Sequence, residues 1–130
     1  MSNGISKDKL TAVINPNQAN QFEWGNIQWL ISGQQNLGAE ITLGYVEIAP
    51  GQKNPLHYHP NSDEVLYLIE GELNHSVGEE MFHLKGGMAI YIAQAMPHDA
   101  FNPGTVPARM VVAYSTGDRQ MVALEEGQDE

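Results

Sequence analysis

The chain has 130 residues and contains no cysteine. It therefore cannot form a disulfide framework, a zinc site with thiolate ligands, an iron-sulfur cluster or a cysteine nucleophile. Any metal ion must be bound through histidine, carboxylate or amide groups.

Positive charge is also scarce, because six lysines and arginines stand against sixteen acidic residues and the formal net charge is −10. Such a surface repels phosphate backbones and anionic lipids, so we expect neither a nucleic-acid nor a membrane partner. No run approaches the roughly 20 apolar residues of a spanning helix. Residues 1–10 lack the apolar core of a secretion signal. We therefore expect a cytoplasmic protein.

The length allows one compact domain and leaves no room for a second core. The ends of the chain are polar, and the last six residues include four acids. We expect an N-terminal arm over residues 1–20, a folded domain over 21–118 and an acidic C-terminal tail over 119–130.

Between Ile27 and Tyr114, apolar residues recur mostly at every second position, which predicts strands rather than helices. Turn signals such as Pro50-Gly51, Gly86-Gly87 and Pro103-Gly104 separate these runs. Many short strands at near-regular spacing indicate an all-β antiparallel sandwich or closed barrel.

The residues that can carry chemistry begin with His57 and His59, which lie two positions apart on an extended segment. Their imidazoles project from one face about 7 Å apart and can converge on one ion where the strand twists. Glu64 returns on the next strand with an anionic oxygen. His98, fixed by the preceding Pro97, can point into the same cavity.

Two sequence motifs contain these residues. The run Gly51-x5-His57-x-His59-x4-Glu64-x6-Gly71 resembles the first motif of the cupin superfamily at its fixed positions, and Gly87 to Asn102 resembles the second motif in its Gly, His and Asn. This chain has Met88, Ala93 and Ala95 where the family usually has Asp, Pro and Gly. These departures concern the turn between residues 92 and 97 and not the four candidate ligands.

The resemblance implies a small single-domain antiparallel β-barrel, or jelly roll, with one divalent metal ion per chain. Its ligands would be His57, His59, Glu64 and His98. Four protein ligands leave a six-coordinate metal two positions for substrate, water or oxygen. We expect manganese, iron or nickel, and the ligand set also suits zinc, cobalt and copper.

Three functions fit such a site. The first is a metal-dependent oxidoreductase, a dioxygenase-like enzyme acting on a small organic molecule, in which Glu64 also has a catalytic role as a proton acceptor. The second is a cupin that binds or senses a small ligand without turning it over. The third is a metal-assisted isomerase or decarboxylase.

Two further histidines, His75 and His83, flank the turn signal Gly78-Glu79-Glu80. A three-residue loop there predicts that His75 lies opposite His83 on an exposed hairpin, away from the functional site. We expect neither histidine to matter for metal binding.

The last strand indicates the nature of the pocket. Met110, Val112 and Tyr114 form its more apolar face and should line the cavity. With Arg119 assigned to the tail, the metal would be the main positive charge, which favours neutral, aromatic or enolisable ligands.

The outward phase of residues 65, 67 and 69 offers an apolar face and predicts a homodimer.

Overall fold

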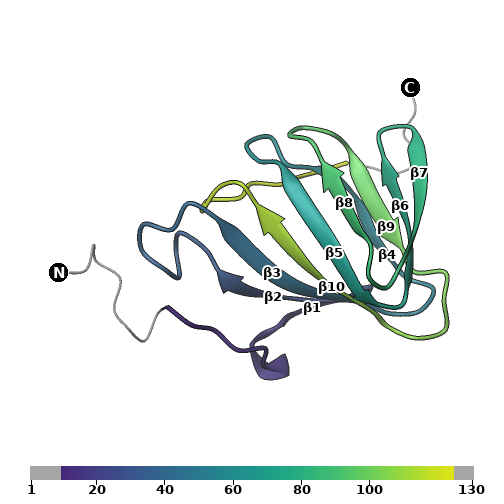
Figure 1. Cartoon of the computed structure of the whole chain (residues 1–130), viewed down its shortest axis with the longest axis horizontal. Coiled ribbons are helices and arrows are strands. Elements are labelled where there is room, and N and C mark those ends of the chain that lie inside the picture. Colours follow the sequence, from purple (N-terminus) through teal and green to yellow (C-terminus); the bar gives the residue numbers. More distant parts are fainter. Residues whose placement is uncertain (1–9, 125–130) are drawn as a thin grey trace.

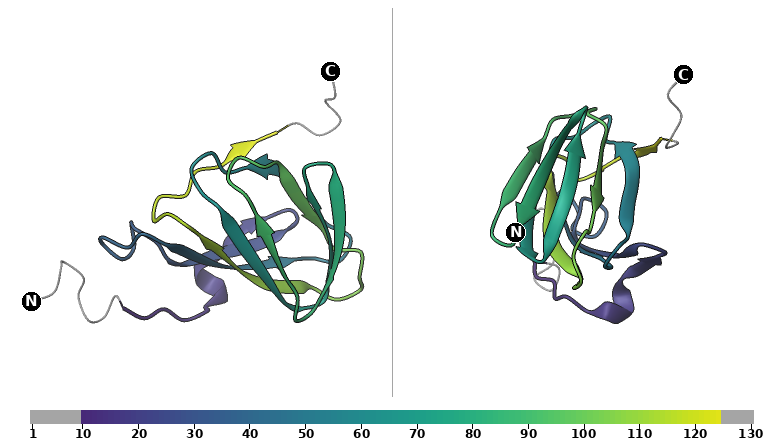
Figure 2. Two further views of the ribbon diagram at one scale, coloured as in Figure 1. Left: turned by 45° about the horizontal axis from the view of Figure 1, so that its top comes forward. Right: turned by 90° about the vertical axis from the view of Figure 1, so that its right-hand side faces the viewer.

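The computed structural model describes residues 10–124 and shows a jelly roll of two antiparallel sheets (Figure 1). Further views show the two layers facing each other (Figure 2). The first sheet has the order β1 (Asn20–Phe22), β2 (Gly25–Ile31), β3 (Thr42–Ile48), β10 (Ala108–Tyr114), β5 (Glu64–Glu70) and β8 (Ala89–Ile92). The second has the order β11 (Val122–Ala123), β4 (Lys53–Tyr58), β9 (His98–Phe101), β6 (Glu72–Val77) and β7 (Glu80–Lys85).

The all-β prediction is therefore confirmed. Within residues 10–124 the backbone hydrogen bonds form two separate sheets and do not join them into one continuous barrel. In the same part of the chain, no helix has the length and apolar character needed to cross a membrane.

The alternation of side chains separates the core from the surface on β5. Leu66 and Leu68 are buried at 4% and 0% exposure, whereas Val65, Tyr67 and Ile69 are exposed at 45%, 43% and 48%. On the neighbouring strand β10 the predicted inward residues are also buried, namely Met110, Val112 and Tyr114. Burial of such aliphatic side chains, each contributing about 1.5–3 kcal/mol, holds the two sheets together.

The hairpin of β6 and β7 corrects one prediction. Val77 pairs with Glu80, so the turn contains two residues rather than three, with Gly78 in the left-handed region at φ 62°. The shorter turn moves the register by one residue, which reverses the face of each side chain on β7. His75 consequently pairs with Phe82, and His83 with Asn74. His75 is buried and His83 is exposed, so they do not face each other.

Both end segments contact the body of the domain. Near the N-terminus, the side chain of Gln28 on β2 accepts a hydrogen bond from the backbone N–H of Asn15 at 2.8 Å and donates one to the carbonyl of Val13 at 3.0 Å. These bonds hold residues 13–15, part of the predicted arm, against β2. In the predicted tail, β11 pairs with β4.

Candidate metal centre

The four predicted ligands come together at the inner face of the jelly roll. His57 lies on β4, opposite His98 at the start of β9, while His59 follows β4 and Glu64 begins β5. Each residue offers a ligand atom, and these atoms all lie within 4.8 Å of one another. The sheets thus bring residues from three strands and a loop to one point.

Backbone carbonyls orient each of the three imidazoles. The Nδ1 atoms of His57, His59 and His98 lie 2.7, 2.8 and 2.9 Å from the carbonyl oxygens of Pro55, Gln120 and Met96. A carbonyl only accepts hydrogen bonds, so each Nδ1 carries the proton and donates it. The lone pair of each imidazole therefore lies on Nε2, which is the form that binds a metal ion.

The atoms that face the centre of the ligand cluster are all hydrogen-bond acceptors. The Oε1 atom of Glu64 lies 3.3 Å from Nε2 of His59 and 3.1 Å from Nε2 of His98. These three atoms are buried and have no hydrogen-bond partner. Lone pairs facing one another in a buried site need a shared cation or a proton to offset their repulsion. The donor set of three imidazole nitrogens and one carboxylate oxygen fits a divalent transition metal.

The electrostatics favour neutral imidazole at His57 and an ionised carboxylate at Glu64. Burial and the nearby charge of His98 lower the pKa of His57 to about 4. Burial would raise the pKa of Glu64, but the adjacent imidazoles of His59 and His98 outweigh it and hold that pKa well below its usual value. Both groups are therefore in the protonation state that a metal ion requires at neutral pH.

An internal cavity of about 320 Å³ adjoins the ligand cluster. Its size is that of a site for a small organic molecule. Most of its wall is apolar. It includes the three residues predicted from β10, which are Met110, Val112 and Tyr114, together with Trp24, Ile27 and Leu66. The prediction of an apolar cavity wall is thus confirmed.

His75 belongs to this cavity, contrary to the prediction that it lies away from the site. It lines the cavity at 1% exposure, and its ring is stacked on that of His98. His75 shares the buried face of β6 with Leu73, and the pairing of β6 with β9 places this face over the cavity. The available sequence signal was the spacing of two residues between Leu73 and His75, which places both side chains on the same face of a strand.

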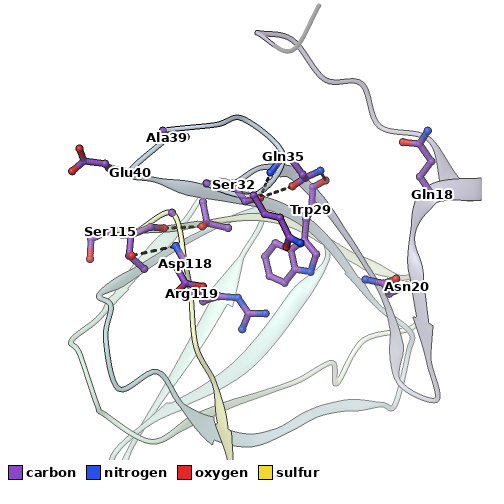
Figure 3. A pocket seen from close by; sticks show the side chains of 16 residues that line it. Gln18, Asn20, Trp29, Ser32, Gln35, Ala39, Glu40, Ser115, Asp118 and Arg119 are labelled. Carbon is purple, nitrogen blue, oxygen red and sulfur yellow. Dashed lines mark hydrogen bonds between the residues drawn. The ribbon is translucent and has the colours of Figure 1, made fainter. Parts of the chain in front are cut away.

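Arg119 also lines the cavity, which corrects its assignment to the tail. Its guanidinium carbon lies 4.3 Å from the ring centroid of Trp29 and 5.4 Å from that of Tyr114. The same side chains of Arg119 and Trp29 border an open polar groove of about 1050 Å³ on the other side (Figure 3). The metal would therefore not be the only positive charge at the cavity.

Comparison with known proteins places this site in a family. The family model of the cupin domain matches residues 44–114, which include all four clustered residues. The chain belongs to the cupin family.

Two curated relatives are similar to this cupin in sequence, and one solved structure is similar to it in fold. It is 44% identical over 73 residues to the tetracenomycin polyketide synthase protein TcmJ of Streptomyces glaucescens, which covers 56% of this chain and 49% of that protein. It is 31% identical over 110 residues to the putative germin-like protein 3-4 of Oryza sativa subsp. japonica, covering 78% of this chain and 46% of that protein. The chain thus spans about half the length of these curated relatives.

The fold is shared with a structure of Bacillus subtilis oxalate decarboxylase from work on the EPR fine structure parameters of its Mn(II) centres. The TM-score is 0.77 at 24% identity, with 82% of this chain and 30% of that chain covered. At this identity the likeness concerns the fold of the cupin domain and not its activity.

Proposed function

We propose that this cupin is a metal-dependent enzyme of the oxygenase type that acts on a small organic molecule. The observation that supports the proposal is the convergence of three carbonyl-oriented imidazoles and one carboxylate at the wall of a cavity of about 320 Å³. In this proposal His57, His59, Glu64 and His98 hold one divalent ion. That ion would supply Lewis-acid or redox chemistry to a molecule in the cavity.

Glu64 would have a second role as a proton acceptor. Its carboxylate is buried at 5% exposure and ionised, and Glu64 lies opposite Tyr114 where β5 pairs with β10. Burial raises the pKa of Tyr114 well above its usual value, and the charge of Glu64 raises it further, so Tyr114 stays a hydrogen-bond donor. A carboxylate held in this way can take a proton from a substrate that is bound beside it.

Manganese, iron and nickel are our proposed metals. An imidazole-rich site with one carboxylate accepts each of them, and metal affinity alone does not select between them. The Mn(II) centres of the oxalate decarboxylase with the same fold support the inclusion of manganese.

Metal analysis followed by a reaction screen tests this proposal. Protein purified without added metal should contain about one divalent ion per chain. Metal-free protein should then be loaded separately with Mn(II), Fe(II) and Ni(II) and offered catechols, flavonols and β-diketones in an oxygen electrode. Oxygen uptake with one of these ions supports the proposal. Carbon dioxide release or isomerisation without oxygen uptake would indicate a decarboxylase or an isomerase instead of an oxygenase.

Matched variants distinguish the site from the rest of the chain. The double variant His57→Ala, His59→Ala should lose stoichiometric metal and oxygen uptake but keep the far-ultraviolet spectrum of a β protein. His83→Ala changes an exposed histidine with its Nδ1 2.8 Å from Oδ1 of Asn74 and should keep both properties. Unchanged metal content in the double variant would contradict the ligand assignment. Binding of the compounds without turnover would support a sensing or binding cupin instead.

We also propose that the protein forms a homodimer through the outer face of β5. Val65, Tyr67 and Ile69 are each more than 40% exposed there, and Tyr91, which pairs with Val65, is 60% exposed. A contiguous apolar face of this kind on a small domain is typical of an interface.

A further inference from the structure

Arg119 lies at the wall between the cavity and the open groove. It is half-buried, and its guanidinium lies over the ring of Trp29 and near the ring of Tyr114. Figure 3 shows its side chain beside the indole of Trp29, among the polar residues of the groove. Both Arg119 and Trp29 line both spaces, so a molecule in the cavity that reaches toward the groove meets this pair of side chains.

We infer that Arg119 binds an anionic oxygen of the cavity's ligand, so that the site selects a small apolar molecule bearing one carboxylate or similar anionic group. The inference rests on the proposed function of the cavity as a substrate site. It assigns Arg119 as the residue that determines charge specificity, in place of the metal alone.

The geometry prepares Arg119 for this role. A guanidinium that lies over an aromatic ring is attracted to it by about 0.5–2 kcal/mol, which fixes its orientation before a ligand arrives. All five N–H donors of a guanidinium lie in its plane, so contact of its face with a ring leaves donors available for a carboxylate. Binding an anion would therefore cost little of the side-chain entropy that a free arginine loses.

No carboxylate forms an ion pair with Arg119 in the described part of the protein. Within residues 10–124 the ion pairs of lysine and arginine side chains with carboxylates are those of Lys53 with Asp99 and of Arg109 with Glu47 and Glu70. In a chain with a formal net charge of −10, a cation of this kind at a cavity is available to bind an incoming anion.

The rest of the cavity determines the remainder of the ligand. Its wall is mainly apolar, with Met110 and Val112 on one side and Leu66 beside them. Glu64, the acid among the clustered ligands, repels a second anionic group close to it. These features favour a molecule with an apolar body in the cavity and a single anionic group toward Arg119, rather than a small dianion.

Benzoate and benzamide test this inference, because they have nearly the same shape and differ in charge. Calorimetry on the metal-free protein should show benzoate binding at least about tenfold more tightly than benzamide. Arg119→Gln and Arg119→Met should each reduce the ratio of benzoate affinity to benzamide affinity to about one. The benzamide affinity of each variant should stay within about threefold of the wild-type value. Arg109→Gln, which removes an arginine from the outer face, should keep the wild-type ratio. Urea unfolding of each variant checks that it is folded.

The outcomes separate this inference from the proposed function. A preference for benzoate that disappears only when Arg119 is replaced supports the inference even if no metal binds. Equal binding of the two probes, no benzoate binding at about 10 mM, or a preference that survives in either Arg119 variant would overturn it. Loss of oxygen uptake alone would count against the enzyme proposal and not against Arg119. Repeating the titration with Mn(II)-loaded protein measures how much the metal adds to the preference.

Discussion

The imidazole of His75 lies parallel to that of His98, with 5.8 Å between the ring centroids and 8° between the planes. On another side, the ring of His57 lies with its centroid 4.3 Å from that of His98. His98 is therefore held between two imidazoles, in addition to its Nδ1 hydrogen bond to the carbonyl of Met96. The ligand set thus has a supporting histidine on β6 that is not itself one of the four clustered residues.

Replacement of His75 by Ala should weaken metal binding, because His98 would lose the ring that packs against it. Groups that orient a ligand typically contribute about 10–100-fold to metal affinity. A competition titration with a chelator measures this change. His83→Ala on the same hairpin is the matched control and should leave the affinity unchanged. Equal affinities for the two variants would mean that His75 does not position His98.

Replacement of Ala95 by Gly should stabilise the protein. Ala95 has φ 68°, in the left-handed region, and its backbone N–H donates to the carbonyl of His59 at 2.9 Å. An L-residue costs about 1–2 kcal/mol in this conformation, and the greater freedom of Gly in the unfolded chain offsets part of the gain. We expect a net gain of up to about 1 kcal/mol in urea unfolding. Ala93→Gly in the same turn should give no gain, and a loss of stability in Ala95→Gly would contradict the prediction.

Tyr45 should make stability depend on alkaline pH. Burial raises the pKa of Tyr45, and its hydrogen bond to Glu47, 2.9 Å long, raises it further. The unfolded phenol ionises near pH 10 and the folded one at higher pH, so the contribution of Tyr45 to stability is lost as the pH rises above about 10. The advantage of wild type over Tyr45→Phe in urea unfolding should therefore be smaller at pH 11 than at pH 8. An advantage that is the same at both pH values would contradict this reasoning.

The proposed dimer should dissociate when charge is placed on the outer face of β5. Tyr67→Glu introduces an anion at a side chain that is 43% exposed, and two copies would repel each other across a symmetric interface. Light scattering at micromolar concentration should give the mass of a dimer for wild type and of a monomer for the variant. Glu79→Ser, in the exposed turn between β6 and β7, is a surface control that should remain dimeric. A wild-type mass of 14.3 kDa would refute the dimer.

The sequence by itself determined the parts of the protein that depend on spacing along one strand. The positions of His57 and His59 on an extended segment, and the inward phase of Met110, Val112 and Tyr114, follow from the period of two residues in a strand. Local spacing was enough here because the side chains of one strand keep their faces wherever that strand lies in the sheet.

Only the tertiary structure decided the positions of His75, Arg119 and Tyr45. The pairing of β6 with β9 places the face that carries Leu73 and His75 over the cavity, whereas the register at Gly78 leaves His83 on the surface. Arg119 reaches the cavity because the chain after β10 returns across Trp29, a contact between residues 90 positions apart. Tyr45 alternates with inward Val46 yet is 8% exposed, because a distant segment covers the outer face near it. Contacts of this kind join segments that are far apart in the chain, so no local period encodes them.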